Sequence, residues 1–187
     1  MAGQETISFS IRDAAESDAA SILDIYAPHV LDGAVTFETE VPTVQEMASR
    51  IRAVSADYPY FTAEDGTGVI GYAYAGRVRS RDAYQWSAEL SIYVREDSRG
   101  RGVGGALVRR IIGALKTMGV KTLYAVITSP NPQSEAFHER LGFKRLCVFE
   151  RMGYKQGLWR DVLWAALALG EYDTPPEPIR PYGRTTR

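Results

Sequence analysis

Alternating apolar and polar positions predict a half-buried strand near the middle of the chain. Leu90, Ile92 and Val94 alternate with polar or aromatic residues, which is the period-two pattern of a strand with one covered face. A helical pattern follows shortly after it. Apolar side chains recur at steps of three and four over residues 103–118, and Gly119 supplies a helix stop. A strand, a glycine-rich loop and an amphipathic helix are therefore predicted in succession.

The same two periods divide the rest of the chain. Helices are predicted to begin at a cap on Ser17 or Asp18, at the capping box Thr43-x-x-Glu46, and at Ser134. Residues 34–38 form either a loop or a short strand. Further strands are predicted over residues 7–11, 60–63, 69–75, 122–128, 144–150 and 159–169, the last of them with room for a bulge. This order of elements predicts an α+β fold, a single domain in which helices sandwich a mixed β-sheet.

Composition separates a folded domain from a C-terminal tail. Residues 171–187 hold four of the nine prolines and few apolar side chains. We therefore expect an extended tail that lies on the domain surface or on a partner subunit. Residues 6–170 form the predicted domain, and a chain of 187 residues that is 45% hydrophobic is long enough for one substantial core.

Charge, targeting signals and cysteine content limit the partners, the compartment and the cysteine chemistry that we expect. A formal net charge of -1 gives no basis for a nucleic-acid partner. No apolar run reaches about 18 residues and the first residues lack a basic and apolar leader, so we expect a cytoplasmic protein without a membrane partner. The single cysteine, Cys147, excludes an internal disulfide and a thiol metal site. Its place in an apolar run predicts a small buried side chain on a strand.

The glycine-rich run over residues 99–104, Arg-Gly-Arg-Gly-Val-Gly, offers main-chain N–H groups at the start of a helix. Such groups attract a phosphate, and glycine lets the phosphate approach and permits a positive φ. The spacing from Gly100 to Gly105 also fits the G-x-G-x-x-G of dinucleotide-binding folds, which need an acidic residue about 20 positions later. Residues 121–128 contain no acidic residue, and no Gly-Lys-Ser or Gly-Lys-Thr follows as a Walker P-loop requires. The run is therefore an anion cradle of another kind.

The spacing Arg-x-x-Gly-x-Gly of Arg99, Gly102 and Gly104 resembles the pyrophosphate loop of the GNAT superfamily of acetyl-CoA-dependent N-acetyltransferases. The resemblance implies the GNAT fold and acetyl-CoA as co-substrate, with no metal. Further segments, in matching order, resemble the phosphinothricin N-acetyltransferase and methionine sulfoximine acetyltransferase family: residues 58–60, 71–76, 81–86, 88–89, 137–143 and 157–162. Known members acetylate the α-amino group of small amino acids such as phosphinothricin, methionine sulfoximine and methionine sulfone.

Two residues are candidates for the catalytic base that such a reaction needs. An α-ammonium has no lone pair, so a base must remove its proton before the nitrogen attacks a thioester. Glu89, at the head of the central strand, is the first candidate, and the alternative is a solvated surface carboxylate. His138 is the second, at a point where many GNAT enzymes have a tyrosine, and its role would be either to take the amine proton or to return a proton to the CoA sulfur. This departure leaves the acid for the leaving thiolate open, with Tyr93 and Tyr124 as alternatives.

The resemblance also implies a cofactor site. A backbone N–H near Tyr93 or Val94 would polarise the acetyl carbonyl. Asn131 would hydrogen-bond the pantetheine or the pyrophosphate, unless it is only a turn residue between two prolines. The predicted cofactor-binding residues are Ile92, Tyr93, Val94, Arg99, Gly100, Arg101, Gly102, Val103, Gly104, Gly105, Asn131 and Ser134.

Two arginines predict how a substrate carboxylate is held. Arg79 and Arg81 project to the same side if the backbone is extended, and two guanidinium groups bind a carboxylate in a bidentate manner. The predicted pocket is completed by the aromatic residues Phe37, Tyr84 and Trp86 and by the segment Trp159-Arg160-Asp161.

Two other classes of protein remain open. A protein or peptide N-acetyltransferase would keep the loop but needs an open acidic groove, against which the paired arginines argue. A catalytically silent acetyl-CoA-binding module would keep the loop and have no use for Glu89 or His138. The apolar last strand and the proline-rich tail also predict a homodimer.

Overall fold

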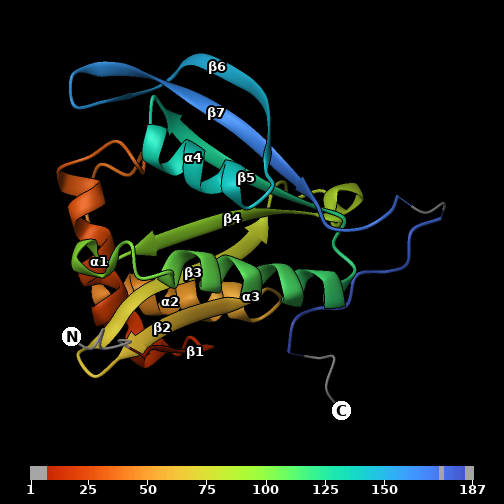
Figure 1. Ribbon diagram of the computed structural model, residues 1–187, viewed down its shortest axis with the longest axis horizontal. Coiled ribbons are helices and arrows are strands. Elements are labelled where there is room, and N and C mark those ends of the chain that lie inside the picture. Colours follow the sequence, from red (N-terminus) through yellow and green to blue (C-terminus); the bar gives the residue numbers. More distant parts are fainter. Residues whose placement is uncertain (1–7, 173–174, 184–187) are drawn as a thin grey trace, which may run out of the picture.

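The computed structural model describes residues 8–172 and 175–183, and a seven-stranded sheet runs through this part of the chain (Figure 1). The strands lie in the order β1, β2, β3, β4, β5, β7, β6, and every neighbouring pair is antiparallel except β4 and β5, which are parallel. Their bounds are β1 (Ser10–Asp13), β2 (Tyr60–Asp65), β3 (Gly68–Arg77), β4 (Ser87–Val94), β5 (Thr122–Ser129), β6 (Lys144–Lys155) and β7 (Leu158–Ala168). The predicted mixed sheet is confirmed. Ile7 of the first predicted strand lies outside the described residues.

The α-helices of the described chain are α1 (Ala19–Leu31), α2 (Val44–Ser55), α3 (Val103–Met118) and α4 (Pro132–Arg140). Asp18 takes the N-cap position of α1. The capping box of α2 is formed as predicted: the Thr43 N–H donates to the Glu46 carboxylate at 2.7 Å, and the Glu46 N–H donates to the Thr43 hydroxyl at 3.2 Å. None of these helices is long and apolar enough to cross a membrane.

Alternate side chains of the central strands supply two hydrophobic cores, one on each face of the sheet. On β2, Tyr60 belongs to the core under α1 and α2, whereas Phe61 belongs to the core under α3. On β3, Tyr72 and Ala73 divide in the same way, as the two-residue period of a strand requires. On the α3 side, α4 packs through Phe137. The helices therefore sandwich the sheet, as predicted.

The outermost strand, β6, differs most from its prediction. It runs on to Lys155 instead of ending at residue 150, and its pairing with β7 shifts between Phe149 and Gly153. Within this irregularity Arg151 has a positive φ of 50°, and its N–H donates to the Asp161 carboxylate at 2.8 Å. The bulge expected on the last strand therefore lies on β6, because an edge strand accommodates extra backbone without breaking a ladder on its other side.

Cys147 is exposed, so the prediction of a buried side chain is wrong. The residue lies on β6, which within the described part of the chain has a neighbouring strand on one side only, and every residue from Lys144 to Met152 is exposed. Large apolar side chains, including Leu146 and Phe149, share this exposure. An apolar run on an edge strand has the same sequence pattern as a covered strand.

The described part of the C-terminal tail returns to the domain without forming a helix or strand. Trp86 donates from its indole nitrogen to the carbonyl of Glu177 at 2.8 Å. Tyr182 donates from its main-chain N–H to the carbonyl of Asp57 at 2.9 Å and from its hydroxyl to Asp13 at 2.8 Å. The tail thus contacts its own domain, and the predicted domain boundary stays a prediction.

Candidate active site

β4 and β5 separate half-way along their length, and a cavity lies between them. Their pairing extends only from Ser87 with Thr122 to Leu90 with Ala125, although both strands continue. Figure 1 shows the two strands diverging from this point. Beyond it, the edge of β4 that faces β5 has no strand partner, so its N–H and C=O groups are available to a ligand. The cavity measures about 300 Å³ and is lined chiefly by β4, β5, α4 and the α1–α2 loop, residues 32–43.

Glu89 points into this cavity from the paired part of β4. Its neighbours Ala88 and Leu90 belong to the core under α3, so the strand alternation turns Glu89 to the opposite face, where it lines the cavity. Burial raises the pKa of its carboxyl, and the charge of Arg79 partly offsets this rise. A half-buried carboxylate with a raised pKa is suited to accept a proton. The alternative of a solvated surface carboxylate does not fit these surroundings.

His138 lines the same cavity from α4 and is only 5% exposed. Its Nδ1 lies 2.8 Å from the carbonyl oxygen of Ser134. A carbonyl only accepts, so Nδ1 carries the proton and Nε2 keeps a lone pair. Burial lowers the pKa of the imidazole, and the bond to Ser134 partly offsets the shift. The rings of Phe137 and Phe143 contact it edge-on, each with centroids 5.2 Å away. His138 is therefore held neutral with one free acceptor nitrogen.

The two tyrosines considered as acids differ in position. Tyr93 lines the cavity, whereas Tyr124 does not. Burial raises the pKa of the Tyr93 phenol well above its ordinary value, so the hydroxyl keeps its proton. The ring of Tyr124 lies against Trp164, with centroids 5.9 Å apart. The geometry favours Tyr93 over Tyr124 as a proton donor.

Two glycines between β4 and α3 have backbone conformations that other residues rarely adopt. Gly100 has a φ of 79°, and Gly102, at the N-cap of α3, has a φ of 83°. These values confirm the prediction of positive φ in the loop. A Cβ at either position would meet no atom within 4 Å, so the surface above them is open. Unpaired N–H groups at the start of a long helix, beneath an open surface, fit a phosphate.

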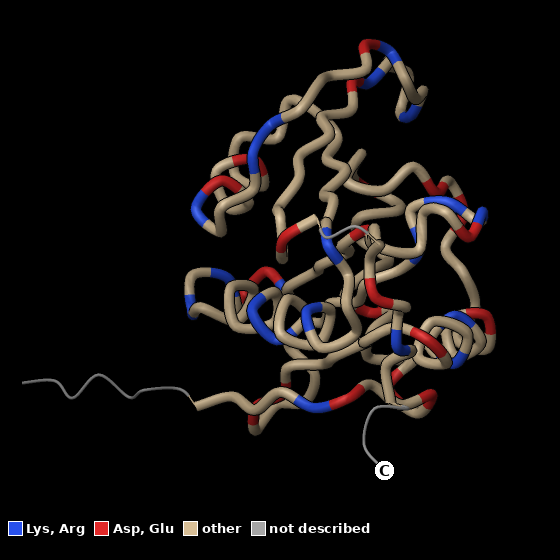
Figure 2. The backbone as a smooth tube through the Cα atoms, turned by 90° about the vertical axis from the view of Figure 1, so that its right-hand side faces the viewer, with Lys and Arg blue, Asp and Glu red and all other residues tan. Residues whose placement is uncertain are grey.

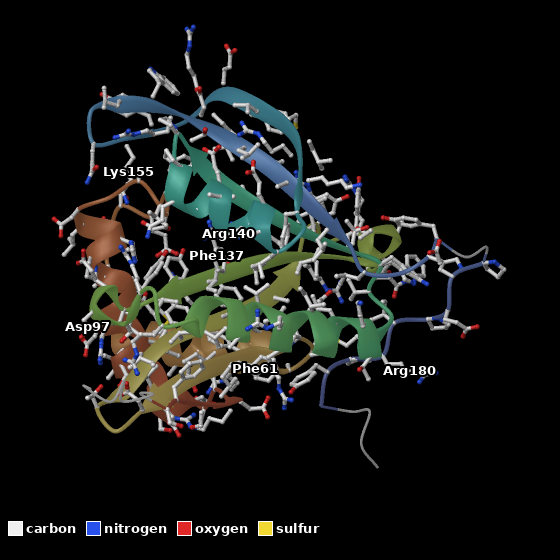
Figure 3. The ribbon with its side chains drawn as sticks, in the orientation of Figure 1. Phe61, Asp97, Phe137, Arg140, Lys155 and Arg180 are labelled. Carbon is white, nitrogen blue, oxygen red and sulfur yellow. The ribbon has the colours of Figure 1, made fainter. Side chains whose placement is uncertain are left out.

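Gly104 is glycine for a different reason. A Cβ there would lie 3.3 Å from the ring of Phe137 and 3.5 Å from Cδ1 of Ile92. Figure 3 shows Phe137 in the space between α4 and α3. The missing side chain therefore lets α3 approach α4 and β4, and the role of Gly104 in cofactor binding stays a prediction.

The guanidinium of Arg101 is used inside the protein. It donates to Asp65 at 2.8 Å and to the hydroxyl of Ser98 at 3.2 Å. Hydrogen bonds from Thr67 and then from Arg101 lower the pKa of Asp65 to about 2. These contacts attach the glycine loop to the turn between β2 and β3. The side chain of Arg101 is therefore already bonded within the protein, while Arg99 presents an exposed side chain.

Asn131 and Ser134 begin α4, and both line the cavity. Asn131 is the N-cap, and its Oδ1 accepts the Ser134 N–H at 3.2 Å. Glu135 fixes the preceding turn by accepting from the Ser129 hydroxyl at 3.1 Å and from the Asn131 N–H at 3.0 Å. Asn131 is thus a structural cap and a lining residue together, so the two interpretations made from the sequence are compatible.

The substrate-binding residues predicted from the sequence do not all meet at the cavity. Phe37 lines it, but Arg79, Arg81 and Tyr84 do not. The premise of an extended backbone is wrong, because residues 78–81 form a bend that leads into a 3₁₀ turn. The condition under which the two arginines were predicted to project to one side is therefore not met.

Arg79 is nevertheless close to the candidate base. Its guanidinium carbon lies 5.7 Å from the ring centroid of Trp164, and it donates to the Val78 carbonyl at 2.9 Å. Its charge lowers the pKa of Glu89, as described above. Arg81 is exposed, and its role in binding a carboxylate stays a prediction.

Two predicted aromatic walls lie elsewhere. Trp86 faces the C-terminal tail and a separate cavity of about 170 Å³ that Tyr172 also lines. Trp159 is 62% exposed and packs against Tyr154 with ring centroids 5.3 Å apart. Neither tryptophan lines the larger cavity.

The α1–α2 loop supplies lining residues that the sequence analysis missed. Thr36 and Glu38 line the cavity beside Phe37. Thr36 shares a 2.7 Å hydrogen bond with the hydroxyl of Tyr26, and Glu38 accepts from Arg50 at 2.7 Å. The loop has no periodic pattern that indicates which of its side chains point inward. From the sequence, residues 34–38 could therefore be assigned only as a loop or a short strand.

The charges of the molecule are mixed in sign. Figure 2 shows Lys and Arg interspersed with Asp and Glu along the chain, in agreement with 22 basic and 23 acidic residues overall. Glu38 and Glu89 are the carboxylates that line the cavity, and Glu38 is paired with Arg50. This lining lacks the excess of acidic groups that a groove for basic peptides needs.

A family profile described as an acetyltransferase (GNAT) domain matches residues 11–164. The chain belongs to the GNAT acetyltransferase family. One GNAT relative, phosphinothricin N-acetyltransferase of Streptomyces viridochromogenes, is 35% identical over 172 residues, 91% of this chain and 93% of the relative. L-Methionine sulfoximine/L-methionine sulfone acetyltransferase of Pseudomonas aeruginosa is 34% identical over 172 residues, 91% of this chain and 100% of the relative.

A solved GNAT structure agrees in fold. The phosphinothricin acetyltransferase from Sinorhizobium meliloti, crystallised in complex with AcCoA, matches with a TM-score of 0.85 and 37% identity over 95% of this chain and 97% of that one. The predicted GNAT fold and the resemblance to the phosphinothricin and methionine sulfoximine acetyltransferases are confirmed. The protein is an N-acetyltransferase.

Proposed function

We propose that this GNAT enzyme transfers the acetyl group of acetyl-CoA to the α-amino group of a small amino-acid-like substrate. Phosphinothricin, methionine sulfoximine and methionine sulfone define the substrate type, after the names of the relatives. The observation that carries the proposal is Glu89, a half-buried carboxylate in the cavity where β4 and β5 part. The cavity's size of about 300 Å³ suits a small amine together with the end of a thioester.

The residues around the glycine loop fit acetyl-CoA as co-substrate. Main-chain N–H groups from the loop and the start of α3 would hold the pyrophosphate, with Gly100 and Gly102 leaving room for it. Asn131 and Ser134 would face the pantetheine arm from the start of α4. The free edge of β4 offers N–H groups near Tyr93 and Val94, one of which would polarise the acetyl carbonyl.

Glu89 would act as the general base. It takes one proton from the substrate ammonium, directly or through one water, and the freed nitrogen attacks the thioester carbonyl carbon. The carbon–sulfur bond then breaks and the acetyl group stays on nitrogen as an amide. The thiolate that leaves needs a proton, for which Tyr93 is positioned as donor. The nitrogen loses a second proton as the carbon–sulfur bond breaks, and the lone pair on Nε2 of His138, in the wall formed by α4, would accept it.

Arg79 is the residue we assign to the substrate carboxylate, with Arg81 as a more distant contributor. Its guanidinium is exposed and its charge reaches Glu89. An amino acid bound with its carboxylate at Arg79 would therefore bring its ammonium toward Glu89. Phe37 would contact the substrate side chain from the opposite wall.

A homodimer formed through β6 completes this proposal. The strand presents an edge without a neighbour, together with the exposed apolar side chains of Leu146, Val148, Phe149 and Met152. A second copy would cover these side chains and pair with the open edge. Light scattering of the wild type and of Phe149→Asp would test the dimer. We also assign the reaction to the cytoplasm, which cell fractionation would test.

The direct test of the activity is release of CoA with a panel of amines. The panel contains phosphinothricin, methionine sulfoximine, methionine sulfone and a basic peptide. We expect acetylation of at least one of the three amino acids and none of the peptide. Turnover of the peptide alone would favour a peptide acetyltransferase. A silent binding module would bind acetyl-CoA, turn over nothing, and lose nothing in Glu89→Ala or His138→Ala.

A further inference from the structure

The hairpin between β6 and β7 contacts the end of α1 and the α1–α2 loop. Nζ of Lys155, the last residue of β6, donates to the carbonyl of Thr36 at 2.8 Å and to the carbonyl of His29 at 3.2 Å. The next residue, Gln156, donates from Nε2 to the carbonyl of Leu31 at 3.0 Å. Figure 3 shows Lys155 below the end of the hairpin and close to α1. Side chains of the hairpin therefore hydrogen-bond to main-chain carbonyls of the loop and of the last turn of α1.

Lys155 occupies an unusual environment for a lysine. Its residue is 5% exposed, and its hydrogen bonds go to main-chain carbonyls. His29 lies in the last turn of α1, where carbonyls have no partner within the helix and the helix dipole favours a cation. Burying an ammonium is unfavourable unless it is hydrogen-bonded. The position therefore needs a cation that reaches both α1 and the loop.

The same hairpin holds Phe37 in place. The ring of Phe37 lies directly on Gly153, so that a Cβ at Gly153 would come within 2.6 Å of Cζ of Phe37. Gly153 is outside the positive-φ region, and the three atoms nearest to a Cβ there all belong to the ring of Phe37. Phe37, Thr36 and Glu38 all line the cavity, whereas Lys155 does not. The position of these three lining residues therefore depends on the contacts between the hairpin and the loop.

We propose that Lys155 is a positioning residue for the amine substrate and that the contact of Gly153 with Phe37 sets which side chains the pocket accepts. Lys155 fixes the α1–α2 loop from outside the cavity, and Phe37 transmits that position to the substrate. The proposal rests on the proposed function for the identity of the ligand. The contacts between hairpin and loop do not depend on it.

The first test compares Lys155→Met with Lys144→Met, an exposed lysine at the other end of the same strand. Methionine fills the space of the lysine chain but donates no hydrogen bond. We expect the KM for the amine to rise about tenfold in Lys155→Met, while kcat changes less than about threefold and the acetyl-CoA Kd less than about twofold. Lys144→Met should match the wild type. An unchanged KM, or an equal loss of acetyl-CoA affinity, would overturn the proposal.

A double-mutant cycle covers the case in which Lys155→Met does not fold. Gly153→Ala should lower kcat/KM by displacing the ring of Phe37. In the background of Phe37→Ala the same glycine substitution should have no further effect, because nothing remains to be displaced. If the two effects simply add, Gly153 does not act through Phe37 and the specificity role is refuted.

Hydrogen exchange separates this proposal from the proposed function. Amides of residues 32–43 should exchange faster in Lys155→Met than in the wild type, whatever amine the enzyme uses. A wild type that acetylates none of the amino acids would refute the proposed function alone. Unchanged exchange in the loop would refute the positioning role alone.

Discussion

The regions to which we assign acetyl-CoA and the amine, called here the cofactor end and the amine end, are built in different ways. The glycine loop of the cofactor end, residues 99–105, lies outside the lining of the cavity. At the cofactor end, one continuous stretch from Glu89 to Gly105 supplies strand, loop and helix start, and an ion pair of Arg101 with Asp65 attaches the loop to the end of β2. At the amine end, the wall comes from the α1–α2 loop and is fixed by a hairpin more than a hundred residues later, where Lys155 reaches Thr36. The backbone of the cofactor end comes from one continuous segment, whereas the wall of the amine end depends on contacts between segments far apart in the sequence.

This difference separates the region that would bind the phosphates of acetyl-CoA from the region that would select the amine. A cradle of main-chain N–H groups recognises the same phosphate whatever side chains surround it. A wall of side chains on a loop changes shape when a distant contact changes. Substitutions at the first end should therefore act on acetyl-CoA, substitutions at the second on the amine, and substitutions between them on the chemical step.

The largest effect is expected for Glu89→Gln, at the junction of the two ends. Loss of the base should lower kcat/KM for the amine by about 10²- to 10⁴-fold. The acetyl-CoA Kd should stay near the wild-type value, because Glu89 lies outside the glycine loop. Steady-state kinetics and calorimetric titration measure the two quantities. The exposed Glu139→Gln on α4 is the control, and a drop in it comparable to that in Glu89→Gln would remove the special role of Glu89.

Gly102→Ala should weaken acetyl-CoA binding without affecting the amine. Alanine at a φ of 83° is strained by about 1–2 kcal/mol, and the loop would shift to relieve it. We expect the acetyl-CoA Kd to rise about tenfold with little change in the amine KM. Gly113→Ala is the matched control in the middle of α3, where a Cβ meets nothing within 4 Å. It should leave binding unchanged and stabilise the helix by about 0.5–1 kcal/mol. Equal effects of the two substitutions on Kd would contradict the cradle.

His138 should make stability depend on pH. Burial lowers its pKa, so the unfolded chain takes up a proton at a pH where the folded chain does not. The free energy of unfolding should therefore fall as the pH drops below the ordinary histidine pKa of about 6.5. Urea titrations of the wild type and of His138→Asn at about pH 7 and about pH 5 measure the slope. The variant should lose part of this pH dependence, and an identical slope in both proteins would refute the buried neutral histidine.

The smallest effect is expected for the tail, which does not line the cavity in the described residues. Tyr182→Phe removes the hydrogen bond to Asp13, which is worth about 0.5–1.5 kcal/mol. Thermal unfolding should register this loss, while kcat, both KM values and the acetyl-CoA Kd stay unchanged. A kinetic effect of the same size as that of Lys155→Met would mean that the tail also shapes the site.

The cofactor end was accessible from the sequence because its residues are neighbours in the chain. A strand period, two glycines with positive φ and a helix period identify the loop at Gly100 and Gly102 without any knowledge of tertiary contacts. The same local logic placed Glu89 on the strand, since alternation with Ala88 and Leu90 fixes its face.

The amine end was not accessible in this way. The neighbourhood of Phe37, Gly153 and Lys155 depends on how a hairpin folds over a loop, and no period in the sequence encodes it. The prediction that Arg79 and Arg81 project to one side assumed an extended backbone where the chain bends, and their role in binding stays a prediction. Cys147 was misplaced because its pattern does not distinguish an edge strand from a covered one.

The central claim is that Glu89 takes the proton of a bound ammonium, and the pH profile of kcat/KM tests it most directly. In the wild type the account predicts a plateau between the raised pKa of Glu89 and the amine pKa of about 8 to 9, because the enzyme binds the ammonium and deprotonates it. In Glu89→Gln only free amine reacts, so kcat/KM should rise about tenfold per pH unit from about pH 6 to about pH 8. A Glu89→Gln profile with the wild-type plateau and rate would contradict the account.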